Sequence, residues 1–383
     1  MHGLIMLLAA GVAARALLAG GPASAPPETE ARPSFAPSRY LATRLNGARP
    51  IIHAGLFASI GRAADGENMN GPSVVRVPDW IPPERRADPR ARYYMYFAHH
   101  VGTYIRMAWA ERIEGPWALF AGTGPDARGV LDLGARRVLP IAPDIELREY
   151  VASPDIHVDA AARRLVMYFH APAAWRGEEL SQRTHVALSG DGLRFAPGIV
   201  PVALAASYPR LFEHRGRPFQ FAFGGALFAP PARDPMWTAP SGYDFRQTAW
   251  PRVGTPFADA LAAPAFEGHR VRHVGVLARS GRVEVFFTLI GATPETILLT
   301  ELDTAAADPR DWRVTVPFEE VLRPEVAWEG ADLPHAQSRS GQAPEDIHQM
   351  RDPRPFIDVD SGVYLFYTAR GEDAIGVARL TRR

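Results

Sequence analysis

Two aspartates stand beside prolines at the starts of apolar runs, where a carboxylate can be held for proton-transfer chemistry. Asp155 follows Pro154, and His157, two residues later, shares its face in an extended strand. Asp352 follows Arg351 and precedes a proline, an arrangement that favours an ion-paired, ionised acid. A turn beside proline is the alternative explanation for each. We treat Asp155 and Asp352 as candidate catalytic residues.

Two further acids have a tryptophan as their chain neighbour. Glu329 follows Trp328 in an expected loop, and a glutamate held against an indole ring can have a raised pKa, as a general acid requires. Asp79 precedes a tryptophan in a similar setting. An ordinary exposed loop position is the alternative for both. Glu329 is the third candidate catalytic residue.

Other polar side chains could bind a ligand around these acids. His99 and His170 close two aromatic runs at matching places, and Arg106 and Arg210 could point inward to hydroxyl or carboxylate groups. Cavity lining, salt bridges and satisfied core positions are the alternatives. No H-x-x-H or H-E-x-x-H pattern is present, so no metal site is predicted. The candidate ligand-binding residues are Asn70, Asp79, His99, Arg106, His157, His170, Arg210, His273, Trp328 and Arg351.

A repeated phrase indicates which elements position these residues. In SPDIHVDAAARRLVMYFH, residues 153–170, a short apolar run is followed by a polar turn and a second run that ends in aromatics. Altered copies occur at 71–100, 208–224, 273–289 and 352–368, with aromatic runs that begin at 93, 165, 218, 283 and 363. Repeats of short strands predict an all-β, five-bladed β-propeller, and an N-terminal strand within 40–59 is expected to complete the last blade. A β-sandwich of about twenty strands is the alternative.

On these phrases the chain resembles the five-bladed β-propeller glycoside hydrolases. These are the family 43 arabinanases and xylosidases and, more distantly, the invertases and levansucrases. The resemblance covers residues 46–383 and rests on RDPRPF at 351–356, SPD at 153–155, NGP at 70–72 and the run YFAHHVGTYIRMAWAERIEGPW at 96–117. It implies a carbohydrate substrate and three acids on the propeller axis: a general base, an aspartate that tunes pKa values, and a glutamate as general acid.

The resemblance also has departures at two of these acids. The family has an aspartate before proline in its first blade, where this chain has Gly71, and a glutamate near the start of its third blade, where this chain reads ASYPR at 206–210. For inverting hydrolysis, Asp155 would then hold or tune the reacting centre, Glu329 would donate a proton, and Asp352 or Asp79 would activate water. A glycoside phosphorylase, with arginine and histidine holding phosphate, and a non-catalytic carbohydrate-binding propeller are the alternatives.

Composition excludes some functions and suggests a compartment. Lys and Arg number 42 and so do Asp and Glu, which argues against a nucleic-acid partner. The chain has no cysteine, which excludes disulfides and thiolate chemistry. An apolar stretch with an A-x-A pattern at 23–25 predicts a signal peptide at 1–25, with a disordered extension as the alternative. We expect a flexible leader at 26–39 and one propeller domain at 40–383, in a secreted or periplasmic monomer without membrane attachment after processing. No cofactor is expected, and an axial calcium ion is left open.

Overall fold

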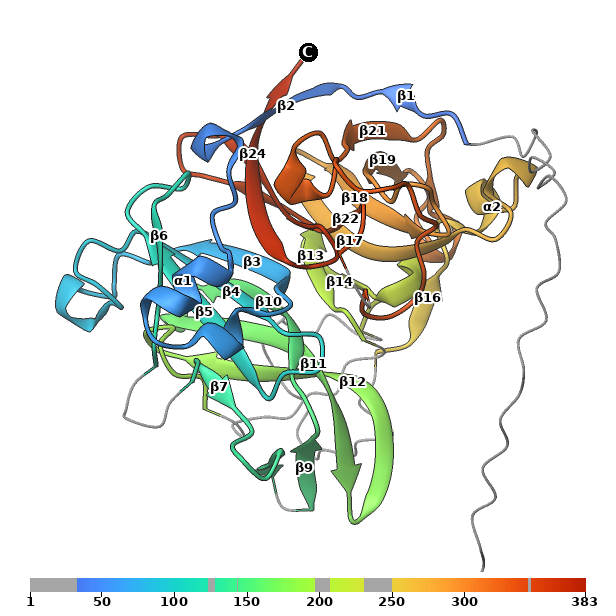
Figure 1. Cartoon of the computed structure of the whole chain (residues 1–383). Coiled ribbons are helices and arrows are strands. Elements are labelled where there is room, and N and C mark those ends of the chain that lie inside the picture. The colour runs from blue at the N-terminus through green and yellow to red at the C-terminus, as the bar shows by residue number, and fades with distance from the viewer. Residues whose placement is uncertain (1–32, 123–127, 143, 197–206, 231–249, 344–345) are drawn as a thin grey trace, which may run out of the picture. The chain divides into compact units, whose positions relative to one another are not determined.

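The computed structural model describes residues 33–122, 128–142, 144–196, 207–230, 250–343 and 346–383. The expected signal peptide at 1–25 lies outside the described residues, as does the first half of the expected leader at 26–39. Residues 34–383 form one unit built from five β-sheets, the blades of a five-bladed β-propeller (Figure 1). The all-β, five-bladed prediction is therefore confirmed.

The strands of the first two blades come from residues 70–189. The first contains β3 (Asn70–Arg76), β4 (Tyr93–Ala98), β5 (Tyr104–Ala110) and β6 (Trp117–Leu119), with β7 (Leu131–Asp132) paired to β5. The second contains β10 (Ala152–Asp159), β11 (Arg164–Trp175), β12 (Glu178–Ser189), β9 (Ile145–Arg148) and β8 (Val138–Ala142).

The other three blades follow in order, and both of the last two recruit an N-terminal strand. The third contains β13 (Arg210–His214), β14 (Arg217–Phe221), β15 (Leu227–Phe228) and β16 (Arg252–Gly254). The fourth contains β17 (Arg270–Arg279), β18 (Arg282–Ile290), β19 (Ile297–Asp303), β21 (Glu319–Leu322), β20 (Arg313–Val314) and β1 (Ala36–Pro37). The fifth contains β22 (Met350–Ile357), β23 (Val363–Ala369), β24 (Ala374–Arg382) and β2 (Tyr40–Arg44).

Helices are short and lie in the connections. The α-helices are α1 (Ala54–Ser59) and α2 (Ala258–Leu261), and the 3-10 helices are η1 (Asn46–Ala48), η2 (Ala63–Gly66), η3 (Pro83–Arg85), η4 (Phe223–Gly225), η5 (Pro264–Phe266), η6 (Pro309–Asp311) and η7 (Ala327–Glu329). Within the part of the chain that the structure describes, no helix is long and apolar enough to cross a membrane.

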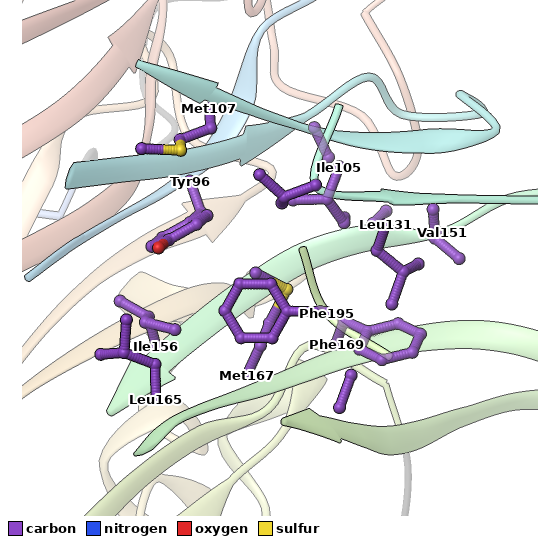
Figure 2. Packing of buried hydrophobic residues seen from close by; sticks show 14 of the residues in the cluster. Tyr96, Ile105, Met107, Leu131, Val151, Ile156, Leu165, Met167, Phe169 and Phe195 are labelled. Carbon is purple, nitrogen blue, oxygen red and sulfur yellow. The ribbon is translucent and has the colours of Figure 1, made fainter. Parts of the chain in front are cut away.

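Five apolar clusters close the ring, one at each boundary between neighbouring blades. Figure 2 shows the cluster between the first and second blades, where Tyr96 and Met107 face Leu165 and Met167. Successive residues of a strand point to opposite faces, and each face of a blade meets a neighbour. On β4, for example, Tyr96 packs toward the second blade and Phe97 toward the fifth. This two-sided burial explains why the aromatic runs are apolar throughout.

The N-terminal strands complete the ring. β2 pairs with β24 antiparallel, so that an N-terminal strand completes the last blade, as predicted (Figure 1). β1 lies in the expected leader and pairs with β21 in parallel. Residues 49–57, the apolar part of the expected N-terminal strand region, form no second strand, and α1 begins at Ala54. The five aromatic runs form β4, β11, β14, β18 and β23, which begin at or one residue before the predicted positions.

Candidate active site

Four inner strands begin with the same strained dipeptide, a residue with positive φ followed by proline. The φ values are +60° at Gly71, +50° at Ser153, +57° at Tyr208 and +52° at Asp352. Outside glycine this conformation is uncommon and costs about 1–3 kcal/mol per residue. In the first, second and fifth blades the pairing with the next strand shifts register at this point. In these three blades the dipeptide therefore separates the polar start of the inner strand from the regularly paired part that follows.

Gly71 explains one departure from the family pattern. A Cβ atom built on Gly71 would lie 2.9 Å from the Cα atom of Ser153, which is closer than real Cβ contacts. The starts of the first and second inner strands therefore touch through backbone at this place. A side chain, including the aspartate of the family pattern, does not fit here without movement of the second blade.

Asp352 is held in a buried polar environment at the start of β22. Its Oδ1 lies 2.6 Å from Nδ1 of His273, and its Oδ2 accepts a hydrogen bond of 3.2 Å from the hydroxyl of Thr368. Burial favours the neutral acid, but the charge and hydrogen bond of His273, the backbone N–H of Gly71 and the charge of Arg210 outweigh it and hold the pKa of Asp352 well below its usual range. Asp352 is therefore ionised at neutral pH.

An aromatic stack lies beside this pair. The ring of Tyr208 lies 4.3 Å from that of His273 and 4.6 Å from that of His170, between centroids. Burial is the main cause that lowers the pKa of His273 and His170, and positive neighbours, including His100, lower the pKa of His170 further. Both histidines are therefore neutral near pH 7. His170 lies close enough to His100 and to His273 to interact electrostatically with each.

Glu372 is a second axial carboxylate, and the sequence analysis did not identify it. It lies in the turn between β23 and β24, and its Oε2 accepts a hydrogen bond of 2.7 Å from Asn68. Its Oε1 lies 3.1 Å from Nη1 of Arg351, and its Oε2 lies 3.5 Å from Nδ1 of His100. Burial raises the pKa of Glu372, but His100 and Arg351 outweigh it and lower the pKa to about 2. A glutamate in a G-E-D turn gives no sequence signal for this role.

Asp155 links three blades at the axis. It is fully buried, it forms an ion pair with Arg354 of the fifth blade, and its Oδ2 accepts a hydrogen bond of 2.8 Å from the backbone N–H of Leu211 in the third. Nε2 of His157, on the same strand as Asp155, lies 2.9 Å from the same oxygen. Burial opposes ionisation, but Arg354 and His157 outweigh it and hold the pKa of Asp155 well below its usual range. The predicted shared face of Asp155 and His157 is confirmed.

Each of the three axial carboxylates therefore has a histidine partner. The pairs are Asp155 with His157, Asp352 with His273, and Glu372 with His100. The carboxylates are at most 1% exposed, whereas the side chains of His100 and His157 are 20% and 18% exposed. A buried carboxylate behind a more exposed imidazole orients the ring.

A chain of buried ion pairs supports Glu372 from the fourth and fifth blades. Arg272 Nε lies 2.8 Å from Oε1 of Glu295, and Arg351 Nε lies 3.5 Å from Oε2 of the same carboxylate. Arg351 also donates a hydrogen bond of 2.7 Å to the side-chain oxygen of Gln349. Arg351 is thus fixed between two glutamates, and we infer that it positions Glu372.

Several polar atoms at the strand starts have no hydrogen-bond partner among the residues that the structure describes. They are Oδ1 of Asn70, Oγ of Ser153 and Nε of Arg210, each in a residue at most 2% exposed. Within the described ranges, the hydrogen bonds that Arg210 donates go to the backbone carbonyls of Pro154 and Pro209. Buried polar groups normally have partners. These three atoms can therefore still form hydrogen bonds at the axis.

The remaining predicted binding residues near the first blade have clear partners. Arg106 donates hydrogen bonds of 2.8 and 3.1 Å to the carbonyls of Asn68 and Glu67, and its guanidinium lies over the ring of Phe57. Nδ1 of His99 accepts a hydrogen bond from a backbone N–H two residues later. Arg106 therefore holds the segment that carries Asn68, behind Glu372, and His99 stays partly exposed.

Three predicted residues have no described contact with this cluster. Glu329 lies in η7, fully buried, with its carboxylate in an ion pair with Arg44 and in a hydrogen bond of 2.8 Å with the hydroxyl of Tyr367. Since Thr368 contacts Asp352, the neighbouring Tyr367 points to the other face of β23. Trp328 stacks on Tyr367, and Asp79 is exposed in a turn. No trio of histidine, aspartate or glutamate side chains within the described ranges is arranged to hold a metal ion.

Comparisons with known proteins agree with this architecture. No sequence profile of a known family matches the chain. An uncharacterised protein of Acanthamoeba polyphaga mimivirus is 28% identical over 321 residues, which cover 82% of this chain and 84% of that protein. Among solved structures, a candidate glycoside hydrolase from Bacteroides ovatus has a TM-score of 0.51 at 12% identity, over 88% of this chain and 95% of its own. An α-L-arabinofuranosidase from Lactobacillus brevis has a TM-score of 0.50 at 12% identity, over 88% and 92%. The resemblance predicted from the sequence is thus confirmed at the level of the fold: the chain has the five-bladed β-propeller fold of these glycoside hydrolases.

Proposed function

We propose that the protein binds a saccharide at the axial cluster and cleaves a glycosidic bond there. The observation that carries this proposal is the set of three carboxylate–histidine pairs at the propeller axis, in a fold shared with glycoside hydrolases. Unpartnered polar atoms of Asn70, Ser153 and Arg210 lie at the same strand starts and would bind sugar hydroxyls.

In this proposal the histidines move protons and the carboxylates position them. Hydrolysis needs a group that protonates the leaving oxygen and a group that takes a proton from the attacking water. His100, partly exposed and paired with Glu372, would protonate the glycosidic oxygen. His273, neutral and paired with Asp352, would accept the proton from water as its oxygen bonds to the anomeric carbon. Asp352 would stabilise the imidazolium that results.

Saccharide binding without turnover is a second candidate function, and one observation favours it. Asp155, Asp352 and Glu372 all have a lowered pKa, and all are buried in ion pairs. Hydrolysis by two carboxyl groups requires one of them to be protonated. The three acids are ionised near neutral pH, so turnover by the usual carboxyl pair is not available to them.

A panel of polysaccharides and aryl glycosides separates the two functions. Wild type and His100→Asn would be tested for sugar release and, by calorimetry, for binding of the same glycans. Release by wild type that is lost in His100→Asn supports cleavage. Binding of a glycan without release from any substrate supports the second candidate. Neither binding nor release by the folded wild-type protein would refute both. Asp79→Asn is the control because Asp79 is exposed and makes no described contact with the cluster.

A further inference from the structure

A cavity of about 520 Å³ lies between the fourth and fifth blades. It is lined by the turn between β17 and β18, the turn between β22 and β23, the last residues of β24 and Tyr40 of β2 (Figure 1 shows these elements). On β17, His273 of the axial cluster lies near the start and Arg279 of the cavity lies at the end. At roughly 3.3 Å per residue, that is a separation of about 20 Å along the strand. The cavity is therefore separate from the axial cluster.

Three arginines converge on one buried carboxylate beside this cavity. Nη2 of Arg279 lies 3.7 Å from Oε2 of Glu284, and Nη2 of Arg382 lies 3.9 Å from Oε1. Nη1 of Arg39 lies 3.7 Å from the same Oε1. The Glu284 side chain is only 3% exposed, and its Oε1 accepts no hydrogen bond within the described part of the chain. One carboxylate cannot neutralise three guanidinium groups, so positive charge is in excess here.

Not all of this charge is neutralised by other acids. Arg39 also pairs with Glu301 and Glu319. Among the described residues, in contrast, Arg279 contacts the hydroxyl of Tyr40 and the distant Glu284, and Arg382 pairs with Glu284 alone. Arg379 lines the cavity, is exposed, and forms no ion pair with any residue that the structure describes. Arg279, Arg379 and Arg382 are therefore the cations available to an anionic ligand.

The cavity also offers hydroxyl groups and a hydrogen-bond acceptor. The hydroxyl of Tyr40 accepts a hydrogen bond from Arg279 and donates one to Glu284, both of 2.7 Å. Ser280, Ser361 and Thr381 add hydroxyl groups to the lining, and Arg282, which pairs with Glu301, lines it as well. A ligand that fits this lining carries an anionic group, which the arginines would bind, and hydroxyl groups. The hydroxyl groups would donate hydrogen bonds to Oε1 of Glu284, which accepts none within the described residues. The volume lies in the range of sites that hold small organic ligands, about 300–1,000 Å³.

We propose that this cavity is a second binding site, which takes an acidic saccharide: a sugar that carries a carboxylate, or a sulfate or phosphate ester. The arginines bind the anionic group, and Glu284 and the hydroxyls bind the sugar hydroxyls. The saccharide part of this assignment rests on the proposed function, whereas the anionic part rests on the cavity alone.

The test measures binding by calorimetry at two salt concentrations. The probes are tetragalacturonic acid, a sulfated heparin disaccharide, glucose 6-phosphate, inorganic sulfate and neutral arabinotetraose. The proteins are wild type, the double variant Arg379→Gln/Arg382→Gln, and the control Arg112→Gln/Arg310→Gln, in which two exposed arginines outside the cavity lose the same charge. Asp352→Asn is included because it changes the axial cluster and leaves the cavity intact.

We expect at least one acidic saccharide to bind wild type, the control and Asp352→Asn alike, with a dissociation constant that rises about tenfold or more in Arg379→Gln/Arg382→Gln. Which probe binds identifies the anionic group. Equal binding by the cavity variant and the control would overturn the proposal, as would binding of inorganic sulfate alone. If no glycan is cleaved but the acidic saccharide binds in this pattern, the proposed hydrolysis fails while the second site stands.

Discussion

At the propeller axis, Nδ1 of His273 lies 2.6 Å from Oδ1 of Asp352, and both side chains are buried. His273 comes from the fourth blade and Asp352 from the fifth, so the pair exists only because the ring brings the two inner strands together. An ionised carboxylate this close to Nδ1 favours the ring form that carries its proton there, and Nε2 of the ring is then left to act as a base. The pair thus favours the tautomer that the proposed proton transfer requires.

Asp352→Asn should abolish most of the catalytic activity without unfolding the protein. The amide removes the charge that stabilises protonated His273, and we expect kcat to fall by about 10²- to 10⁴-fold. The measurement is kcat and KM on the best substrate of the glycan panel, with the melting temperature as a check on folding. The same measurements on Asp79→Asn, an exposed aspartate, should match wild type. A folded Asp352→Asn variant with wild-type kcat would contradict the role of the pair.

Arg354→Ala should destabilise the fold strongly. The substitution leaves Asp155 buried without its arginine partner, and loss of one partner of a buried ion pair costs about 3–5 kcal/mol. Denaturant unfolding at pH 7 measures the change. Arg90→Ala removes an exposed arginine that pairs with Asp88 and should change stability little. Equal small effects of the two substitutions would show that Asp155 does not depend on Arg354.

Gly71→Ala should cost more stability than Gly216→Ala. Both glycines have positive φ, at +60° and +69°, so alanine strains the backbone at both positions. At Gly71 the added Cβ atom also meets the Cα atom of Ser153 at 2.9 Å, whereas no atom lies within 4 Å at Gly216. We expect an additional loss of about 1–3 kcal/mol at Gly71 from this overlap. Equal free energies of unfolding for the two variants would contradict the close approach of the first two blades.

Acid should destabilise the protein below about pH 6.5, partly through His185. Burial lowers the pKa of His185 to about 4, below the value of about 6.5 in an unfolded chain. The unfolded state therefore binds the proton first, and stability falls as the pH drops from 6.5 toward 4. Unfolding free energies at pH 7.5, 6 and 5 should decline less in His185→Gln than in wild type. The remaining decline comes from His170 and His273, whose pKa values are also lowered by burial. A variant that declines as steeply as wild type would contradict this account.

The strands were predictable because their signal is local. In a propeller both faces of a blade are buried against its neighbours, so runs such as YYMYFA at 93–98 are apolar throughout. The apolar stretch at 49–57, which was expected to belong to the N-terminal strand region, was the exception because it forms no strand. Part of it forms α1, which buries Phe57 against the first blade. The sequence pattern there could not distinguish a strand from a short helix that covers a blade.

The axial acids were only partly predictable because pairing depends on ring closure. Asp155 and Asp352 have a proline beside them, which marks the starts of the inner strands. Glu372 has no such mark, and it meets Asn68 and His100 only when the first and fifth blades join. The tryptophan beside Glu329 suggested a catalytic environment, but in the structure Trp328 stacks on Tyr367 and donates its N–H to Ala48. A chain neighbour is not necessarily a contact of the side chain.

Glu372 and Glu329 provide the most direct test of the axial site. Both are buried, and both are paired with an arginine, Arg351 and Arg44 respectively. They differ in position, since only Glu372 contacts a histidine of the axial cluster. The measurement is sugar release per folded molecule by Glu372→Gln and Glu329→Gln, with and without phosphate. We predict that Glu372→Gln no longer releases sugar and that Glu329→Gln still does. Release that requires phosphate would identify a phosphorylase. Release that survives in Glu372→Gln and disappears in Glu329→Gln would contradict the axial assignment.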